Sequence, residues 1–153
     1  MAVVKADAYG HGDTVIAPYF ASLGADWFAV SCLAEAMRLR RIGIRQPILI
    51  LGYTAPQEAA RLAQLALVQS IPDESYALAL EAQAAAAGCT VQAHLAMDTG
   101  MGRIGFSVLA QPQQALRQML RSCALPHLRV SGAFTHFSVA DSAAQEDVDY
   151  TQV

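Results

Sequence analysis

The first twelve residues, "MAVVKADAYGHG" (1–12), place a lysine directly after an apolar run and directly before a glycine-containing turn. Lys5 is the only lysine in the 153 residues, and the nine other basic side chains are arginines. A lysine in a mostly apolar pocket has its charged form disfavoured, so its amine becomes available to attack a carbonyl, which an arginine cannot do. The sequence therefore predicts a reactive amine at the end of a first strand, residues 1–5.

Beyond this lysine the chain alternates apolar runs of strand length with segments of helical period. Runs such as "ILIL" (48–51) are apolar on both faces, which is typical of parallel strands covered by helices. Pro18 lies inside the first predicted helix, where it indicates a late start or a kink. The pattern predicts six strands, 1–5, 27–32, 47–53, 67–71, 90–98 and 128–138, and helices at 13–24, 33–43, 56–66, 72–88, 108–122 and from 141 onward.

Two α/β architectures accommodate six such β/α units. An open doubly wound sheet could be complete at this length, whereas a (β/α)8 barrel needs roughly 200–250 residues. The alternation alone slightly favours the open sheet. Both folds place their functional residues at the carboxyl ends of the strands, so the residues found there decide between them.

Composition restricts the class of protein. Charged residues make up 15% of the chain, against roughly 25% in an ordinary soluble domain, so part of the surface is expected to be covered. The net charge of −3 and the absence of a basic cluster argue against nucleic acid or an anionic membrane as partner. Cys32, Cys89 and Cys123 show no CxxC spacing, which indicates reduced core thiols in a cytoplasmic protein.

Three segments carry a resemblance to a known family. "AVVKADAYGHG" (2–12) closely resembles the pyridoxal phosphate attachment segment of alanine racemases, whose lysine forms the internal aldimine. "MDTGMGRIGF" (97–106) and "GAFTHFSVAD" (132–141) resemble two further signatures of that family, each at the expected strand end. The resemblance implies a partial (β/α)8 TIM barrel, a pyridoxal 5'-phosphate cofactor, and interconversion of L- and D-alanine.

The resemblance also implies roles for individual residues. Lys5 would hold the cofactor and act as one of two acid/base groups at the substrate α-carbon. Tyr9 would direct its hydroxyl to the cofactor phosphate. Arg103 would donate to the cofactor phenolic oxygen and help to place the substrate carboxylate. His136 would lie near the cofactor ring, and Leu51 would line the pocket floor behind it. No metal site is expected, because the other histidines lack ligand spacing.

The chain departs from the family pattern at one informative position. Ala96 stands where many alanine racemases have a lysine modified by carbon dioxide, whose carboxylate steers the arginine matching Arg103. Arg103 is therefore expected to be oriented by another anion, a chloride or a different side chain. Asp98 and Thr99 are expected to shape the intervening loop through bonds from side chain to backbone. "ILILGYTAP" (48–56) is similar to racemase domains linked to vancomycin resistance, some of which prefer serine, so the choice between alanine and serine stays open.

The family fold continues beyond the length seen here. Alanine racemases add a β-rich C-terminal domain to the barrel, and their homodimer builds each site from both chains. Residues 1–153 correspond to a single incomplete pyridoxal phosphate-binding barrel domain, without the tyrosine that serves as second base. We therefore expect a racemase fragment that is inactive alone and homodimeric in its full-length form.

Two other functions remain open. A non-catalytic barrel that buffers pyridoxal phosphate shares the lysine-bearing first strand, but an arginine such as that in "DTGMGR" (98–103) is a refinement that a carrier hardly requires. A Schiff-base aldolase without cofactor is discouraged by Tyr9 close to the lysine.

Overall fold

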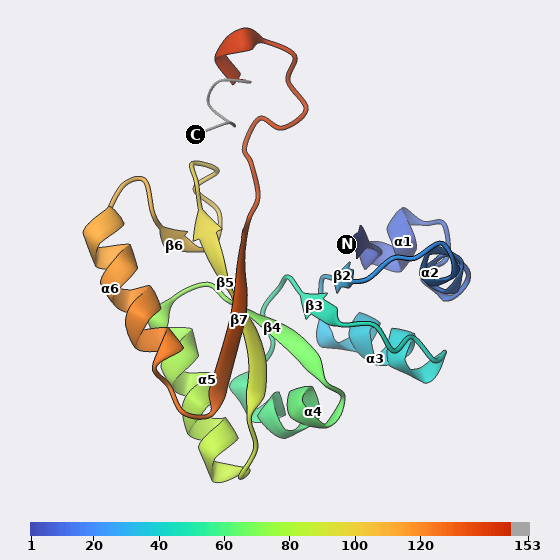
Figure 1. Cartoon of the computed structure of the whole chain (residues 1–153), viewed down its shortest axis with the longest axis horizontal. Helices are drawn as coiled ribbons and strands as arrows, with labels where there is room; N and C mark the ends of the chain where they lie inside the picture. Colours follow the sequence, from blue (N-terminus) through green and yellow to red (C-terminus); the bar gives the residue numbers. More distant parts are fainter. Residues whose placement is uncertain (148–153) are drawn as a thin grey trace.

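The computed structural model describes residues 1–147, which form one sheet of parallel strands flanked by helices (Figure 1). The strands are β1 (Ala2–Val3), β2 (Phe28–Val30), β3 (Ile48–Ile50), β4 (Leu67–Ile71), β5 (Val91–Asp98), β6 (Phe106–Ser107) and β7 (Leu128–Thr135). The helical segments are α1 (Lys5–Tyr9), α2 (Asp13–Ser22), α3 (Leu33–Arg41), the 3-10 turn η1 (Pro56–Glu58), α4 (Ala59–Gln64), α5 (Glu74–Ala86) and α6 (Pro112–Cys123). The predicted α/β class is confirmed.

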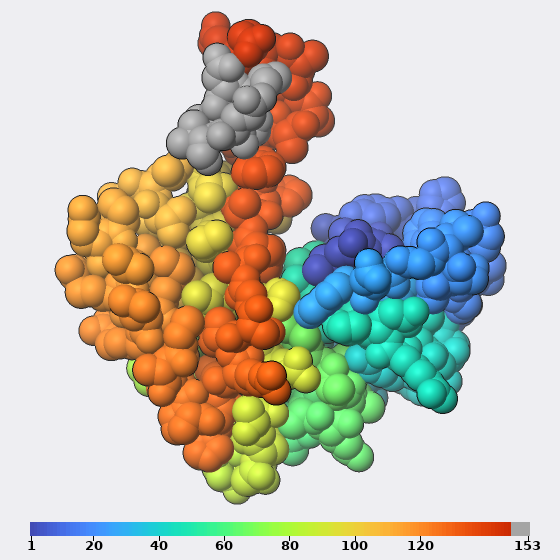
Figure 2. Space-filling model, viewed as in Figure 1, coloured from blue at the N-terminus to red at the C-terminus, as the bar shows by residue number. Residues whose placement is uncertain are grey.

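The order of the strands identifies the architecture. β1 to β5 lie side by side in chain order, β7 pairs with β5, and every pairing is parallel. A doubly wound sheet reverses its strand order at a switch point, and the described strands show no such reversal. The sheet is therefore a section of a (β/α) barrel. Within residues 1–147, β1 pairs only with β2, and Figure 2 shows a hollow between the N-terminal segment and β7.

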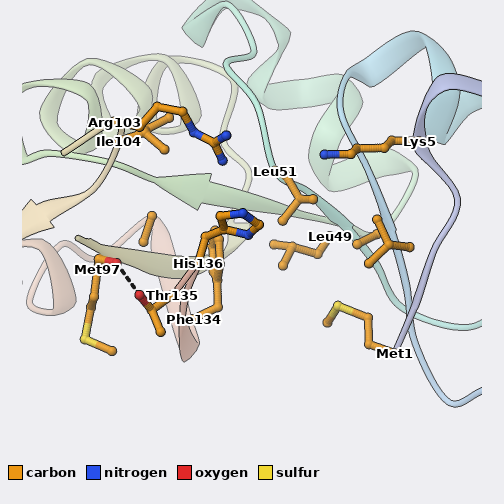
Figure 3. Close-up of a pocket in the computed structure, with 13 residues that line it drawn as sticks. Met1, Lys5, Leu49, Leu51, Met97, Arg103, Ile104, Phe134, Thr135 and His136 are labelled. Carbon is orange, nitrogen blue, oxygen red and sulfur yellow. Dashed lines mark hydrogen bonds between the residues drawn. The ribbon is translucent and has the colours of Figure 1, made fainter. Parts of the chain in front are cut away.

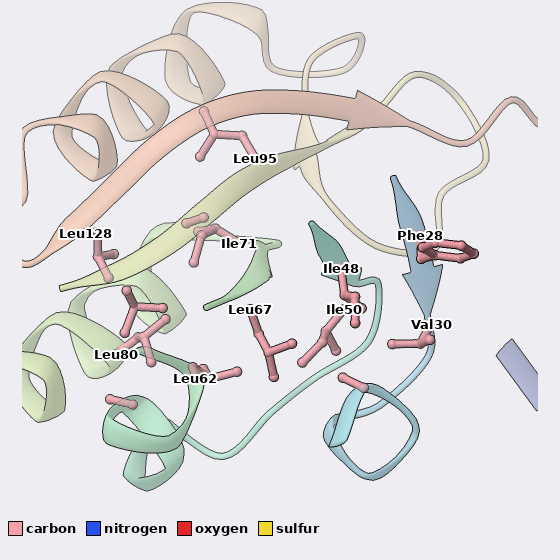
Figure 4. Close-up of a cluster of buried hydrophobic side chains, with 14 of the residues drawn as sticks. Phe28, Val30, Ile48, Ile50, Leu62, Leu67, Ile71, Leu80, Leu95 and Leu128 are labelled. Atoms are coloured by element: carbon pink, nitrogen blue, oxygen red, sulfur yellow. The ribbon is translucent and has the colours of Figure 1, made fainter. Parts of the chain in front are cut away.

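Both faces of the sheet are apolar, as the runs in the sequence predict. One face of each strand packs against the helices, where Phe28, Ile48 and Leu67 belong to the main core (Figure 4). The intervening residues form a second cluster on the opposite, inner face, built on Ala29, Leu49 and Val68, with Trp27, Leu51 and Phe134 packed against it. This alternation with period two places Leu51, at the end of the third strand, on the inner side of the barrel.

Several predicted boundaries are wrong. The first strand ends at Val3 rather than Lys5, because β1 pairs with a single neighbour over two residues. α2 begins at Asp13 and runs through Pro18, so a late start does not occur; the buried Asp13 anchors the first turn by binding Arg38 of α3. The short strand β6 was not predicted, and the helix predicted at 108–122 begins only at Pro112, as α6.

The remaining differences concern the last predicted helix and the cysteines. Of the helix predicted from residue 141 onward, residues 145–147 are helical and residues 141–144 are not, so its predicted start is wrong; residues 148–153 lie outside the described residues. The cysteines form no disulfide, but Cys123 is exposed at the end of α6 and is not a core thiol. None of the helices in residues 1–147 combines the length and the apolar character needed to cross a membrane.

Candidate functional site

A cavity of about 260 Å³ lies at the carboxyl ends of the strands. Lys5 reaches it from beyond β1, Leu51 from the end of β3, and His136 from the residue after β7. Arg103 enters from the loop between β5 and β6. The complete lining comprises Met1, Val3, Lys5, Ala29, Leu49, Leu51, Ala96, Met97, Arg103, Ile104, Phe134, Thr135 and His136.

Two positive groups face each other across this cavity. Figure 3 shows the Lys5 amine and the Arg103 guanidinium pointing toward one another from opposite sides, with Leu51 and His136 between them. The walls that separate the two groups are mostly apolar. The arrangement suits a flat, partly apolar molecule with anionic groups, because the cavity binds its body and the two cations bind its charges.

Four of the five predicted site residues line the cavity, and Tyr9 does not. Tyr9 is 61% exposed, and its ring lies beside the lysine, with Lys5 Nζ 5.9 Å from the ring centroid. A cation over an aromatic face at this distance is weakly attracted. The ring of Tyr9 therefore lies beside the lysine and does not line the cavity, and the role of its hydroxyl toward a phosphate stays a prediction.

The backbone after Lys5 turns in the left-handed sense. Ala6, Asp7, Ala8 and Tyr9 have φ angles of 51, 55, 53 and 55°. Left-handed helical backbone costs roughly 1–2 kcal/mol per non-glycine residue, so the surrounding contacts must offset a cost of several kcal/mol. Such strain concentrates at functional sites, where the structure around it over-determines the conformation. The turn therefore marks the Lys5 segment as the most constrained part of the site.

Hydrogen bonds fix both ends of this turn. At its start, the Ala6 N–H donates to Glu35 Oε1 at 2.8 Å. At its end, the Gly12 N–H donates to the Asp7 carbonyl at 2.9 Å, and the Asp13 N–H donates to Asp7 Oδ1 at 3.0 Å. Glu35 and Asp7 were not singled out by the sequence, because an acidic residue in a helix or loop is ordinarily a surface charge.

The loop that presents Arg103 is organised by Asp98. Asp98 Oδ1 accepts the N–H groups of Gly100 at 3.0 Å and Gly102 at 2.9 Å, which confirms the expected bonds from side chain to backbone for Asp98; for Thr99 they stay a prediction. The N–H of Gly102, and next that of Gly100, holds the pKa of the Asp98 carboxyl below its ordinary value. Gly105 lets the loop return against β5, because its φ is +124° and a Cβ there would lie 2.8 Å from the Ala96 carbonyl oxygen.

A pair of hydroxyls connects this loop to β7. Thr99 Oγ1 lies 2.7 Å from Thr135 Oγ1, and Thr135 donates to the Met97 carbonyl at 2.8 Å. Thr135 immediately precedes His136, so the hydroxyl pair connects the loop after β5 to the end of the strand that carries the histidine. Phe134 and Thr135 also line the cavity. They were not predicted as lining residues, although both fall within the "GAFTHFSVAD" segment.

The orientation of the Arg103 side chain is not set by an acidic neighbour. Within residues 1–147, no carboxylate lies within ion-pair distance of Arg103, and Ala96 lines the same cavity. The expectation of an added anion beside Arg103 therefore stays a prediction. In the same part of the chain, no group of three His, Cys, Asp or Glu side chains is placed to hold a metal ion.

Comparison with known proteins assigns this arrangement to a family. The family model described as "Alanine racemase, N-terminal domain" matches residues 1–153. The chain belongs to the alanine racemase family. Among curated relatives, it is 43% identical over 151 residues to an alanine racemase of Clostridium perfringens, covering 99% of this chain and 38% of the relative. It is 40% identical over 152 residues to a serine/alanine racemase of Enterococcus gallinarum, covering 99% of this chain and 20% of that relative.

A solved racemase structure agrees with the barrel section. The chain superimposes on alanine racemase of Clostridium difficile 630 with a TM-score of 0.89 at 30% identity, covering 99% of this chain and 39% of that one. The chain thus spans roughly a fifth to two fifths of the length of these family members. The fold of the N-terminal barrel domain is shared along essentially all of the 153 residues.

Proposed function

We propose that this chain is the cofactor-binding part of a pyridoxal phosphate-dependent amino-acid racemase. The observation that carries the proposal is the pairing of Lys5 and Arg103 across one apolar cavity, in a chain of the alanine racemase family. The whole protein would then be an isomerase that interconverts the L- and D-forms of a small amino acid.

The residues of the cavity fit pyridoxal phosphate. The Lys5 amine would attach the aldehyde carbon covalently, and the apolar floor at Leu51 would contact the ring. The Arg103 guanidinium would donate to the phenolic oxygen, His136 would lie beside the ring, and Tyr9 would offer its hydroxyl to the phosphate. When bound, pyridoxal phosphate supplies an electron sink for the negative charge that develops at the α-carbon of an amino acid.

Lys5 would also move the proton. Its Nζ would take a proton from the α-carbon or return one to it, because the amine lines the cavity that would hold the substrate. Racemisation needs a second proton-carrying group on the opposite face of the α-carbon. The described residues that line the cavity include no tyrosine, so we expect the 153-residue chain alone to be inactive. We propose that the partner in a cytoplasmic homodimer supplies this group.

Arg103 would orient the substrate. A planar guanidinium forms two parallel hydrogen bonds with a carboxylate and can also reach a neighbouring oxygen. Placed opposite Lys5, it would hold the substrate carboxylate so that the α-hydrogen points at the amine. Alanine is the first candidate substrate. Serine is the second, because the serine/alanine racemase of Enterococcus gallinarum is similar to this chain.

The test is racemisation by the protein that carries this chain, supplied with pyridoxal phosphate. We expect formation of D-alanine from L-alanine, D-serine from L-serine, or both, and loss of this activity in Lys5→Ala. Cofactor binding at Lys5 without racemisation of either amino acid would instead support a non-catalytic pyridoxal phosphate-binding barrel.

A further inference from the structure

Glu35 connects the end of β2 to the turn that follows Lys5. It lies in the first turn of α3, yet its carboxylate also reaches the segment after β1. Oε1 accepts the Ala6 N–H at 2.8 Å, whereas Oε2 accepts the Ser31 N–H at 2.7 Å and the Ser31 hydroxyl at 2.8 Å. The Glu35 carboxylate therefore connects the start of α3 to Ala6, which lies 29 positions earlier in the chain.

Ala6 needs this acceptor because of the handedness of its turn. The first N–H groups of any helical turn have no partner within that turn. Ala6 is the first left-handed residue, and the only hydrogen-bond acceptor described for its N–H is Glu35. Without this bond, the start of the turn keeps the backbone bond from the Ala8 N–H to the Val4 carbonyl at 3.0 Å, but the Ala6 N–H loses its described acceptor and the unfavourable φ of Ala6 is offset less.

The position of β1 beside a single described neighbour makes the hydrogen bond between Ala6 and Glu35 more important. β1 pairs over two residues with β2, and the last described backbone bond to the β2 strand before the lysine is the Val4 N–H to the Ala29 carbonyl at 2.9 Å. Lys5 lies between that bond and the Glu35–Ala6 bond. The two bonds therefore bracket the lysine and fix the direction in which its side chain leaves the backbone.

The charge state of Glu35 suits an acceptor. Burial raises the pKa of its carboxyl, but hydrogen bonds from the Ser31 N–H and hydroxyl, Ala6 and Cys32 together outweigh burial and bring the pKa below its ordinary value. An ionised carboxylate presents acceptors on both oxygens, and hydrogen bonds to a charged acceptor are stronger than those between neutral groups.

We propose that Glu35 is a positioning residue for the Lys5 amine, acting through the Ala6 N–H to hold the left-handed turn that aims the side chain into the cavity. The inference rests on the proposed function, because it is expressed through covalent attachment of pyridoxal phosphate at Lys5. The attachment itself forms a carbon–nitrogen double bond from the amine and the aldehyde and releases one water.

The experiment compares Glu35→Gln and Glu35→Ala with Glu58→Gln, a matched change at a surface carboxylate paired with Arg61. Each protein is incubated with pyridoxal phosphate, reduced with borohydride, and analysed for the rate of label at Lys5. A parallel reaction with acetic anhydride reports whether the amine is merely accessible. Circular dichroism and urea unfolding establish that each variant is folded.

We expect the rate of pyridoxal phosphate labelling to fall about tenfold in Glu35→Ala, the effect of losing one charge-assisted hydrogen bond. In Glu35→Gln the fall should be smaller but measurable, because an amide offers one acceptor oxygen where several donors converge. Acetylation of Lys5 should change little, and Glu58→Gln should match the wild type. In the Glu35 variants, the Ala6 amide should also exchange its hydrogen faster than in the wild type.

The outcomes distinguish a failure of the positioning role of Glu35 from a failure of the proposed function. If the wild-type protein is labelled at Lys5 and both Glu35 variants are labelled at the same rate, the positioning role is overturned and the proposed function is not. Equal losses in labelling and acetylation would also overturn it, since they would indicate a general disturbance of the fold. A wild-type chain that takes no label at Lys5 would contradict the proposed function and, with it, this inference. If Glu35→Ala does not fold, Glu35→Gln carries the same comparison.

Discussion

The fully buried carboxylate of Asp13 accepts three hydrogen bonds from Arg38, at 3.0 and 2.8 Å from Nε and 2.6 Å from Nη2. The two side chains are unequal in burial, since Arg38 is 42% exposed and Asp13 is 0% exposed. The pair joins the first turn of α2 to α3, on the outer side of the Lys5 segment. Removing Arg38 therefore leaves a buried carboxylate unpaired, whereas removing Asp13 leaves a partly exposed guanidinium unpaired.

We predict that Arg38→Met destabilises the chain more than Asp13→Asn. Arg38→Met leaves a buried carboxylate without a partner, which costs about 3 kcal/mol in the free energy of unfolding. Asp13→Asn leaves a half-exposed arginine that water can solvate, at about 1 kcal/mol. Urea unfolding followed by the fluorescence of Trp27, the single tryptophan, measures both. Equal losses would show that the asymmetry in burial has no energetic consequence.

Gly105 is predicted to be intolerant of a side chain. A Cβ there would lie 2.8 Å from the Ala96 carbonyl oxygen and 2.8 Å from the Asp98 nitrogen, at a φ of +124°. Gly105→Ala should lower the free energy of unfolding by about 2 kcal/mol or more, because backbone atoms cannot move aside. Gly88→Ala is the control, since its φ is +60° and nothing lies within 4 Å, and about 1 kcal/mol is expected. Urea unfolding of the two variants decides the comparison, and similar losses would contradict the steric argument.

The loop before Arg103 should loosen at low pH. The folded pKa of Asp98 lies below its ordinary value of 3.8, so the bonds to Gly102 and Gly100 are fully present above that value. They are lost as the pH falls through the lowered folded pKa, because protonation weakens the acceptor. NMR shifts of the Gly100 and Gly102 amides should titrate in this acidic range in the wild type and stay flat in Asp98→Asn. Amide shifts that titrate equally in the variant would exclude Asp98 as the cause.

Patterns of local sequence predicted the α/β class and the parallel strands, but not the barrel architecture or the contacts across it. The apolar runs such as 48–51 predicted the parallel strands, because strands buried on both faces have no polar alternation. The alternation of elements favoured an open doubly wound sheet, the resemblance of three segments to alanine racemases indicated a barrel, and the strand order confirms the barrel. Glu35 and Asp7 escaped prediction, because their partners are backbone N–H groups placed by the left-handed turn. No local propensity favours that turn at Ala6 or Ala8.

Arg103→Lys is predicted to reduce turnover more than cofactor retention in the protein that carries this chain. A lysine keeps the charge but loses the planar fork that bridges a cofactor oxygen and a substrate carboxylate. It also introduces a second amine facing Lys5. We expect turnover to fall on the order of tenfold or more, with pyridoxal phosphate binding less affected. Arg117→Lys, at an exposed position of α6, is the matched control. Wild-type turnover in Arg103→Lys would show that the guanidinium is only structural.

The position of a borohydride-reduced pyridoxal phosphate label on this chain tests whether Lys5 is the cofactor attachment site. Lys5 is the only lysine, so the label should map to its peptide, and fragment-ion spectra can separate Lys5 from the nearby amino group of Met1. The account predicts label on Lys5 in the wild type and its disappearance in Lys5→Ala. A label that survives Lys5→Ala at full yield would contradict the assignment of this lysine as the cofactor attachment site.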